Sequence, residues 1–228
     1  ESAEESAGEA TAGTAEQLLL PVASLQGLIV HGRARIGEVI TTGLVLVNVD
    51  ATVNSDGNVL RLDPVIAEIA GGTVRVGLHY DVSGDVPAVT LTNQSRNLDV
   101  GELLEALEIT DKVEGKGSLD ADVSGKGADV DGVIASLSGD MQFRLNDGAL
   151  KGFDLQATLL KLQGGLAAFQ GKEVTETQQP EAQTRFTELT GSFDVSQGVF
   201  SNDDLAMKAP AFRVGGSGLI DLPKSAID

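Results

Sequence analysis

The sequence contains no cysteine, and aromatic residues make up only 4% of it. Without cysteine there are no disulfide bonds, no structural thiolate zinc sites and no thiol catalysis. The lack of cysteine is compatible both with the bacterial envelope and with the cytoplasm. Because aromatic residues are scarce, we expect any apolar surface of the fold to be lined by smooth aliphatic side chains.

Long apolar runs are also missing, since none approaches the ~20 residues that a membrane-spanning helix needs. The first residues are Glu, Ala, Ser, Gly and Thr, without the basic and apolar regions of a signal peptide. We interpret residues 1–17 as a disordered acidic linker and residues 18–228 as one domain. A chain that begins in a linker is expected to be part of a longer protein, with any targeting or anchoring segment upstream.

Basic residues are few. The sequence has 16 Lys and Arg against 34 Asp and Glu, which gives a net charge of −18. This balance argues against nucleic-acid binding, which requires clustered basic side chains to neutralise phosphates. It equally argues against a basic patch for an anionic membrane surface. The simplest interpretation of the charge is solubility, and a salt-rich habitat would select the same excess.

Glycine is abundant, with 28 residues, and apolar residues alternate between the turns. Alternation of period two predicts strands with one apolar face and one polar face. Short strands joined by tight turns, such as residues 55–58 and 83–85, predict antiparallel meanders. The alternating segments are residues 45–53, 74–82, 119–123, 141–145 and 189–195.

Three segments have helical rather than alternating patterns. Asp99 and Glu102 form a capping-box pattern before leucines at helical spacing, which predicts a helix over residues 99–107. A shorter helix is expected over residues 128–137, started by Asp129. Residues 153–169 carry a leucine stripe typical of an amphipathic helix. The polar residues 171–184 are expected to form a mobile loop.

A search for catalytic groups finds little. His31 and His79 are the only histidines, and neither has an Asp or Glu at a sequence spacing that indicates a catalytic pair. No serine sits in a Gly-x-Ser-x-Gly elbow, so a serine hydrolase site is not predicted. We interpret both histidines as solvated side chains, and we expect the protein not to be an enzyme. An activity that disappears when His31 or His79 is replaced would contradict this expectation.

Metal and phosphate motifs are equally incomplete. Asp129, Asp131 and Gly132 resemble the start of a calcium loop, but the later ligands are missing. The glycine-rich residues 115–117 and 215–218 lack the Gly-Lys-Ser/Thr of a phosphate loop, so they are better interpreted as bulges or strand ends. We therefore expect no metal and no cofactor.

The predicted strands carry more apolar surface than two or three short helices can cover. One solution is a closed sandwich of two sheets. The other is a long sheet that curls into a trough and leaves its apolar side chains facing a cleft. Base rates alone favour the closed core.

Eight segments occur with a distinctive order and spacing. They are residues 43–49 (GLVLVNV), 56–64 (DGNVLRLDP), 96–104 (RNLDVGELL), 113–127 (VEGKGSLDADVSGKG), 137–155 (LSGDMQFRLNDGALKGFDL), 184–193 (TRFTELTGSF), 198–205 (GVFSNDDL) and 212–223 (FRVGGSGLIDLP). Taken in order, these segments resemble the C-terminal region of the AsmA family. The resemblance covers most of residues 25–223, and the order and spacing of the segments are more specific than any single motif.

The resemblance implies a mainly β fold with a few short helices, in which an elongated, curled antiparallel sheet forms a taco-like groove. It implies a periplasmic protein anchored to the inner membrane by an upstream helix. It also implies phospholipid movement toward the outer membrane and outer-membrane assembly, with no catalytic motif. The partners would be phospholipid or another acyl-chain lipid, and possible envelope assembly proteins, but no nucleic acid.

A groove of this kind needs only to match the apolarity of a bilayer. Moving a ~16-carbon acyl chain out of water gains on the order of 13 kcal/mol, and a bilayer offers a similar gain. We expect ten residues to contact acyl chains: Val45, Val47, Val49, Val74, Val76, Leu78, Leu119, Val123, Met141 and Phe143. The alternative is a non-enzymatic scaffold or interaction domain for outer-membrane protein assembly, with a closed core.

Overall fold

The computed structural model describes residues 25–41, 43–152, 155, 182–224, 226 and 227. The expected linker over residues 1–17, the expected helix over 153–169 except Leu155, and most of the expected loop lie outside these residues. The last residues of that loop, Gln183 and Thr184, begin a strand.

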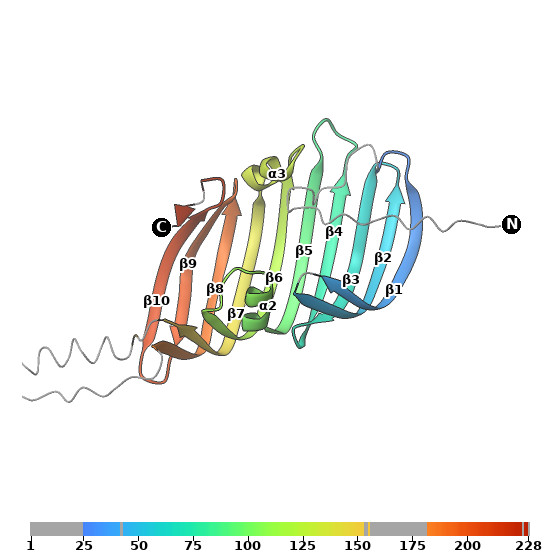
Figure 1. The fold of residues 1–228 in the computed structure, drawn as a ribbon. Coiled ribbons are helices and arrows are strands. Elements are labelled where there is room, and N and C mark those ends of the chain that lie inside the picture. The colour runs from blue at the N-terminus through green and yellow to red at the C-terminus, as the bar shows by residue number, and fades with distance from the viewer. Residues whose placement is uncertain (1–24, 42, 153–154, 156–181, 225, 228) are drawn as a thin grey trace, which may run out of the picture.

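The described chain is dominated by one antiparallel sheet of eleven strands. Their bounds are β1 Ile29–Thr41, β2 Leu44–Asp56, β3 Val59–Ile69, β4 Gly72–Asp81, β5 Ala88–Asp99, β6 Val113–Lys126, β7 Ser138–Lys151, β8 Gln183–Ser196, β9 Val199–Lys208, β10 Arg213–Asp221 and β11 Ala226–Ile227. Each strand pairs only with its neighbours in sequence, from β1 at one edge to β11 at the other. The result is an elongated, curled sheet (Figure 1). The predicted fold class is therefore confirmed, and the closed two-sheet sandwich is not formed by the described residues.

Tight turns join the first strands as the sequence predicts. The Asp56 carboxylate accepts hydrogen bonds from the backbone N–H groups of Asn58 and Val59 at 3.2 and 3.0 Å. The Asp81 carboxylate in the same way accepts from the Ser83 backbone and hydroxyl. Both turns are stabilised by an aspartate that bonds to the backbone a few residues on, which is the usual reason for aspartate in turns.

The curl of the sheet coincides with breaks in strand pairing. Asn48 in β2, Asn97 in β5 and Asp147 in β7 have positive φ angles of 54°, 56° and 49°. The pairing register shifts beside Asn48 and Asn97. Asn and Asp tolerate this left-handed conformation better than other side chains, and a bulge bends its strand and increases the local twist. These three residues lie toward the same end of their strands, where Figure 1 shows the sheet curling.

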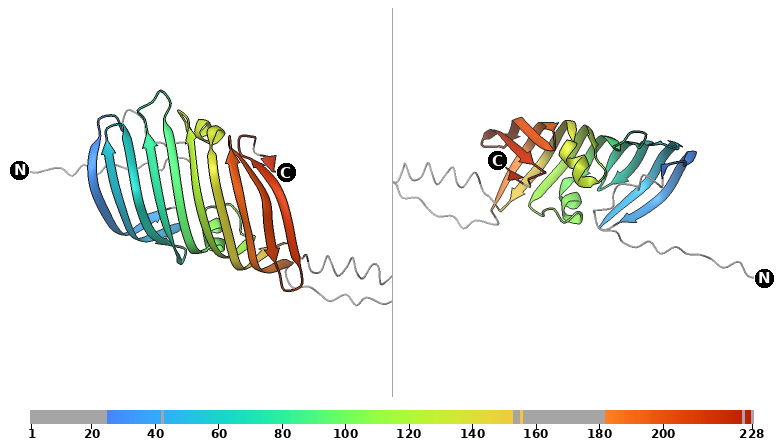
Figure 2. Two further views of the ribbon diagram at one scale, coloured as in Figure 1. Left: turned by 180° about the vertical axis from the view of Figure 1, so that it is seen from behind. Right: turned by 90° about the horizontal axis from the view of Figure 1, so that it is seen from above.

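Two short helices lie on one face of the sheet, at opposite ends of β6. They are α2, Val100–Ala106, and α3, Val130–Ser136. The views in Figure 2 place both on the same side. Each begins as the sequence predicts: Asp99 Oδ1 accepts from Glu102 N at 3.1 Å, and Asp129 Oδ1 accepts from Gly132 N at 2.8 Å. An aspartate at this position satisfies one of the amides left without a partner in the first turn.

The most buried cluster lies where residues 25–28, just before β1, pack against the sheet. Leu25, 1% exposed, packs against Leu60, Tyr80 and Val82. Gly27 N donates to Gly57 O at 3.0 Å, which holds this segment against the β2–β3 turn. The chain therefore covers one end of the sheet on the face that carries the helices.

Candidate functional site

The two faces of the sheet differ in polarity, and β6 defines them. Gly117, Leu119, Ala121, Val123 and Gly125 alternate along one face of β6, and the helices pack on this face. A Cβ on Gly117 would overlap Val100 of α2, and one on Gly125 would lie 2.6 Å from Val133 O of α3. We call the side of Leu119, Ala121 and Val123 the apolar face and the opposite side the polar face.

An unbroken cross-strand row of uncharged residues runs along the apolar face from β1 to β10. Residues directly opposite each other in an antiparallel pair lie on the same face, so the register identifies the row. We call it the Leu78 row. It consists of Gly32, Val53, Leu62, Leu78, Leu91, Val123, Gly139, Val195, Phe200 and Ile220.

Two further rows lie beside the Leu78 row, toward α2. The Val76 row contains Ala34, Ala51, Val65, Val76, Asn93, Ala121, Met141 and Phe193. The Val74 row contains Ala67, Val74, Ser95, Leu119, Phe143 and Gly191. Together the three rows give the apolar face a broad strip without a charged side chain.

Aromatic rings extend this strip toward the C-terminal strands. The rings of Phe143 and Phe193 stack with centroids 5.9 Å apart, and Phe193 meets Phe200 edge-on at 6.1 Å. These three rings come from β7, β8 and β9. Such pairs bury area and favour particular ring orientations, so each of these rings restricts the orientation of its neighbour.

Most of the strip is half-buried rather than packed into a core. Val123 and Val195 are buried, whereas Leu91 is 37% exposed in the middle of its row. Among the described residues, the two short helices and the segment around Leu25 cover only the ends of the strands. The described residues therefore leave the middle of the apolar face accessible to another molecule.

Eight of the ten residues expected to contact acyl chains lie on this face. Val49 is buried beside Ala51, and the other seven belong to the three rows. Val45 and Val47 lie elsewhere. Because pairing shifts at Asn48, Val47 pairs with Glu68, and both valines line a hollow of about 460 Å³ with Glu68, Thr73 and Arg96. The asparagine inside the alternating run was the only signal of this change.

Among the polar side chains on the apolar face, Asn93, Ser95 and Asn202 were not anticipated from the sequence. Asn93 and Ser95 are neighbours on β5, and Asn202 lies beside Gly191, where an added Cβ would come within 3.0 Å of its Nδ2. Ser95 and Asn202 are buried at 3% and 6% exposure. They interrupt an otherwise apolar surface, and each makes hydrogen bonds within the sheet.

The polar face is held together by cross-strand ion pairs. Arg33 binds Asp50 from β1 to β2, Arg96 binds Asp120 at 2.7 Å, and Glu188 binds both Lys208 at 2.6 Å and Arg144 at 3.0 Å. The hydrogen bond from Lys208, with the attraction of both cations, holds the pKa of the Glu188 carboxyl below its usual range. All are at least partly exposed, so each stabilises the sheet modestly.

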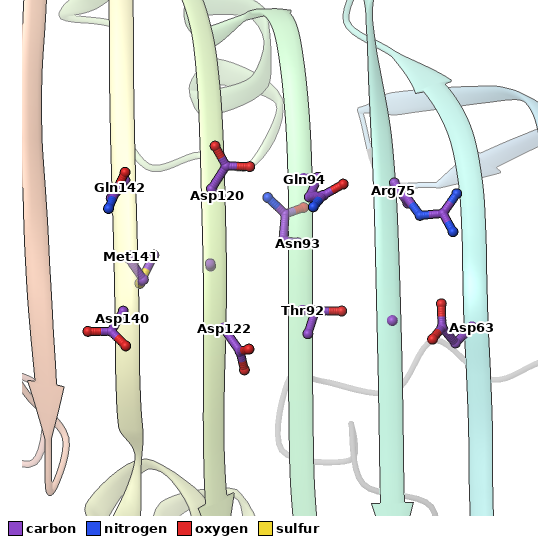
Figure 3. Close-up of a pocket in the computed structure, with 12 residues that line it drawn as sticks. Asp63, Arg75, Thr92, Asn93, Gln94, Asp120, Asp122, Asp140, Met141 and Gln142 are labelled. Atoms are coloured by element: carbon purple, nitrogen blue, oxygen red, sulfur yellow. The ribbon is translucent and has the colours of Figure 1, made fainter.

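Figure 3 shows a hollow on the polar face that is rich in carboxylates. It has a volume of about 570 Å³ and extends from β3 to β7. Its acidic side chains are Asp63, Asp120, Asp122 and Asp140, with Arg75 as its cation. Within the part of the chain that the structure describes, no group of three or more His, Cys, Asp or Glu could hold a metal ion.

The two histidines lie in one cross-strand row on β1 and β4. Asn54 and Arg61 separate them in that row. His31 Nδ1 lies 3.2 Å from Asn54 Oδ1, and His79 Nε2 is buried without a hydrogen-bond partner. This row does not place either histidine beside a serine and a carboxylate in the order that acyl transfer requires.

None of the helices among the described residues is both long and apolar enough to cross a membrane. Gly115 lies at a bulge in the β6–β7 pairing, as the sequence suggested for residues 115–117. Asp203 and Asp204 lie within β9, and the Asp204 carboxylate accepts hydrogen bonds from the Ser192 backbone and hydroxyl at 2.7 Å each.

Comparison with known proteins gives one consistent result. The model of the AsmA family matches residues 22–205. Protein AsmA of Escherichia coli strain K12 is 21% identical over 204 residues, which is 90% of this chain and 32% of that protein. The AsmA family protein YhjG of the same organism is 27% identical over 120 residues, or 53% of this chain and 16% of the relative. The chain thus spans about a third of the length of protein AsmA and a smaller share of YhjG. No solved structure matches it.

Proposed function

The chain belongs to the AsmA family, and from that premise we propose that it is a non-enzymatic envelope protein that binds or conducts lipid along its apolar face. The observation that carries the proposal is the Leu78 row, which continues from β1 to β10. Strands lie about 4.8 Å apart, so ten of them extend the row over about 43 Å. That is longer than the ~30 Å hydrocarbon core of a bilayer.

The strip is suited to an acyl chain that slides along it rather than to a ligand held in a fixed pocket. It has no charged residue in its three rows, and its half-buried residues offer contact along its whole length. An acyl chain on such a surface gains about what it gains in a bilayer, so it can enter and leave without a large barrier. No catalytic group is required for this role, and neither histidine contributes to it.

Location and partners follow from the same proposal. The protein would act in the periplasm, attached to the inner membrane, and would support phospholipid transport to the outer membrane and its assembly. The net charge of −18 disfavours direct adhesion to anionic lipid headgroups. Lipid is therefore proposed to contact the apolar face through its acyl chains.

A lipid-retention experiment tests the proposal. The purified protein would be incubated with phospholipid vesicles, re-isolated, and examined by native mass spectrometry and lipid extraction. Leu91→Asp places a carboxylate in the middle of the Leu78 row. An isolated charge in an apolar environment is unfavourable by several kcal/mol, so we expect retained lipid to fall by at least ~10-fold.

Ser124→Asp is the matched control, because Ser124 is exposed on the polar face of β6 next to Val123. This variant should retain lipid as the unmodified protein does. Circular dichroism of both variants would verify that the sheet is formed. If the unmodified protein retains no lipid, or both variants retain it equally, the lipid proposal is wrong, and the scaffold alternative gains support.

A further inference from the structure

We infer that Asn93 hydrogen-bonds the ester carbonyl of a bound glycerolipid, and so makes the apolar face prefer ester-linked lipids to lipids that lack a carbonyl. This inference rests on the proposed lipid function and names the ligand chemistry of the same surface. Its basis is the position of a single amide in the Val76 row and the hydrogen bonds that this amide leaves unused.

Asn93 lies near the centre of the sheet on β5. In its row it stands between Val76 of β4 and Ala121 of β6. The Leu78 row passes on one side, where the nearest residue on β5 is Leu91, 37% exposed. Asn93 itself is half-buried. A chain lying along the strip would therefore pass directly beside its amide.

The amide uses half of its hydrogen-bonding capacity within the protein. Asn93 Nδ2 donates to Leu119 O at 2.9 Å, and Asn93 Oδ1 accepts from the Ser95 hydroxyl at 2.9 Å. A primary amide can donate two hydrogen bonds and accept two. Since these two bonds fix the orientation of the amide, one N–H and one acceptor position remain for another molecule among the described residues.

Asn202 shows what a fully structural asparagine on this face looks like. Its Nδ2 donates to Ser192 O at 2.6 Å and to Asp204 Oδ1 at 2.8 Å, and its Oδ1 accepts from Leu205 N at 3.1 Å. It is 6% exposed. Both of its N–H groups are used and the side chain is buried, so it can offer nothing to a ligand.

The chemistry around Asn93 favours a neutral partner. The three rows carry no charged side chain, and the ion pairs that hold the sheet together lie on the polar face. A phosphate or free carboxylate placed beside Asn93 would lose hydration without meeting a cation, which is strongly unfavourable. An ester carbonyl is a neutral acceptor that lies next to the acyl chain in a glycerolipid, and it can accept the unused N–H.

The test compares an ester-linked phosphatidylcholine with its ether-linked analogue. The two lipids share headgroup and chain length and differ in the carbonyl. The full chain would be incubated with vesicles containing both in equal amounts, and the ester-to-ether ratio of the retained lipid would be measured by mass spectrometry. For the unmodified protein we expect about five-fold enrichment of the ester lipid, which corresponds to about 1 kcal/mol.

Asn93→Leu should retain both lipids with a ratio near one, and Asn93→Ala should do the same if the leucine variant folds poorly. Asn202→Leu is the matched control. It should lose stability because its hydrogen-bond network is broken, but it should keep the five-fold ratio. A purely structural role for Asn93 would change stability and the total lipid retained, but would leave the ratio unchanged.

The outcomes separate this inference from the proposed function. Equal retention of the two lipids by the unmodified protein would overturn the role of Asn93 while leaving lipid binding intact. Retention of neither lipid would overturn the proposed function itself. An ester preference that survives in both Asn93 variants would assign the selectivity to another group and would also refute the inference.

Discussion

Val100 of α2 lies directly over Gly117 of β6, so close that a Cβ on the glycine would overlap the Cγ2 atom of the valine. The absence of a side chain at Gly117 is what allows α2 to rest on the apolar face. The helix ends beside the β1–β2 turn, where a Cβ on Gly43 would come within 2.9 Å of Ala106 O. α2 thus depends on two glycines, one in β6 and one in the β1–β2 turn.

Gly117→Ala is therefore expected to destabilise the protein by displacing α2. Overpacking of a close contact lowers the free energy of unfolding by about 1–3 kcal/mol. The double variant Val100→Ala/Gly117→Ala removes the overlapping methyl group and should recover part of the loss. Urea denaturation of the two single variants and the double variant measures the coupling. If the two substitutions changed the free energy of unfolding strictly additively, the side chains at positions 100 and 117 would not be in repulsive contact.

The N-cap of α2 gives a pH-dependent prediction. Hydrogen bonding from the Glu102 backbone N–H, and then from Lys116, holds the pKa of the Asp99 carboxyl below its usual range. A lowered pKa in the folded state means that the charged carboxylate adds stability above the unfolded pKa of about 3.9. That contribution is lost as the pH falls through the lower, folded pKa.

Asp99→Asn keeps a capping oxygen but removes the charge, whereas Asp99→Ala removes the cap and should lower the free energy of unfolding by about 1 kcal/mol. The advantage of the unmodified protein over Asp99→Asn should be constant between pH 5 and 7, and should shrink below about pH 4. Denaturant titrations at several pH values test this. If the stability advantage of the unmodified protein over Asp99→Asn grew as the pH fell, the predicted direction of the effect would be wrong.

The segment before β1 is expected to be a real part of the fold. Leu25 is 1% exposed against Leu60, Tyr80 and Val82, whereas Leu28 is 42% exposed. Leu25→Ala should lower the free energy of unfolding by about 2–4 kcal/mol because it leaves a cavity. Leu28→Ala is the matched control, with an effect within about 0.5 kcal/mol. Similar unfolding curves for the two variants would show that this cluster contributes little.

Three carboxylates oppose one another in a single row of the polar face. Asp140 pairs directly with Asp122 on one side and Asp194 on the other. Like charges directly opposite each other destabilise a sheet, so Asp140→Asn should raise the free energy of unfolding by a few tenths of a kcal/mol at low salt. The gain should fade in high salt as the repulsion is screened. Asp85→Asn, in an exposed turn, should show no such salt dependence.

The fold class could be predicted from the sequence because alternation of period two is a local signal that repeats in every strand. Residues 119–123 and 141–145 alternate without interruption, and the structure pairs them on one face as expected. The caps of α2 and α3 were equally visible, since Asp99 and Asp129 act on amides three residues away. These features depend only on neighbours in sequence.

What the sequence could not reveal depends on distant pairing. Val45 and Val47 alternate perfectly with Val49, yet the left-handed Asn48 shifts their pairing and sets them beside Glu68. Asn93 looks like an ordinary polar position until the register places it between Val76 and Ala121. His31 and His79 are far apart in sequence, but share a cross-strand row. A single sequence does not specify register across several strands.

The strictly sequential order of the strands has a consequence for how such a sheet can vary. Since each strand meets only the strands before and after it, a hairpin could be inserted or deleted without rerouting the rest of the chain. Each two-strand unit would change the sheet by about 10 Å in the direction across the strands, while the distance between the two helix-covered margins would stay the same. The extent of the sheet across its strands and the distance between its helix-covered margins are thus independent properties of this architecture. Evolution can alter one without changing the other.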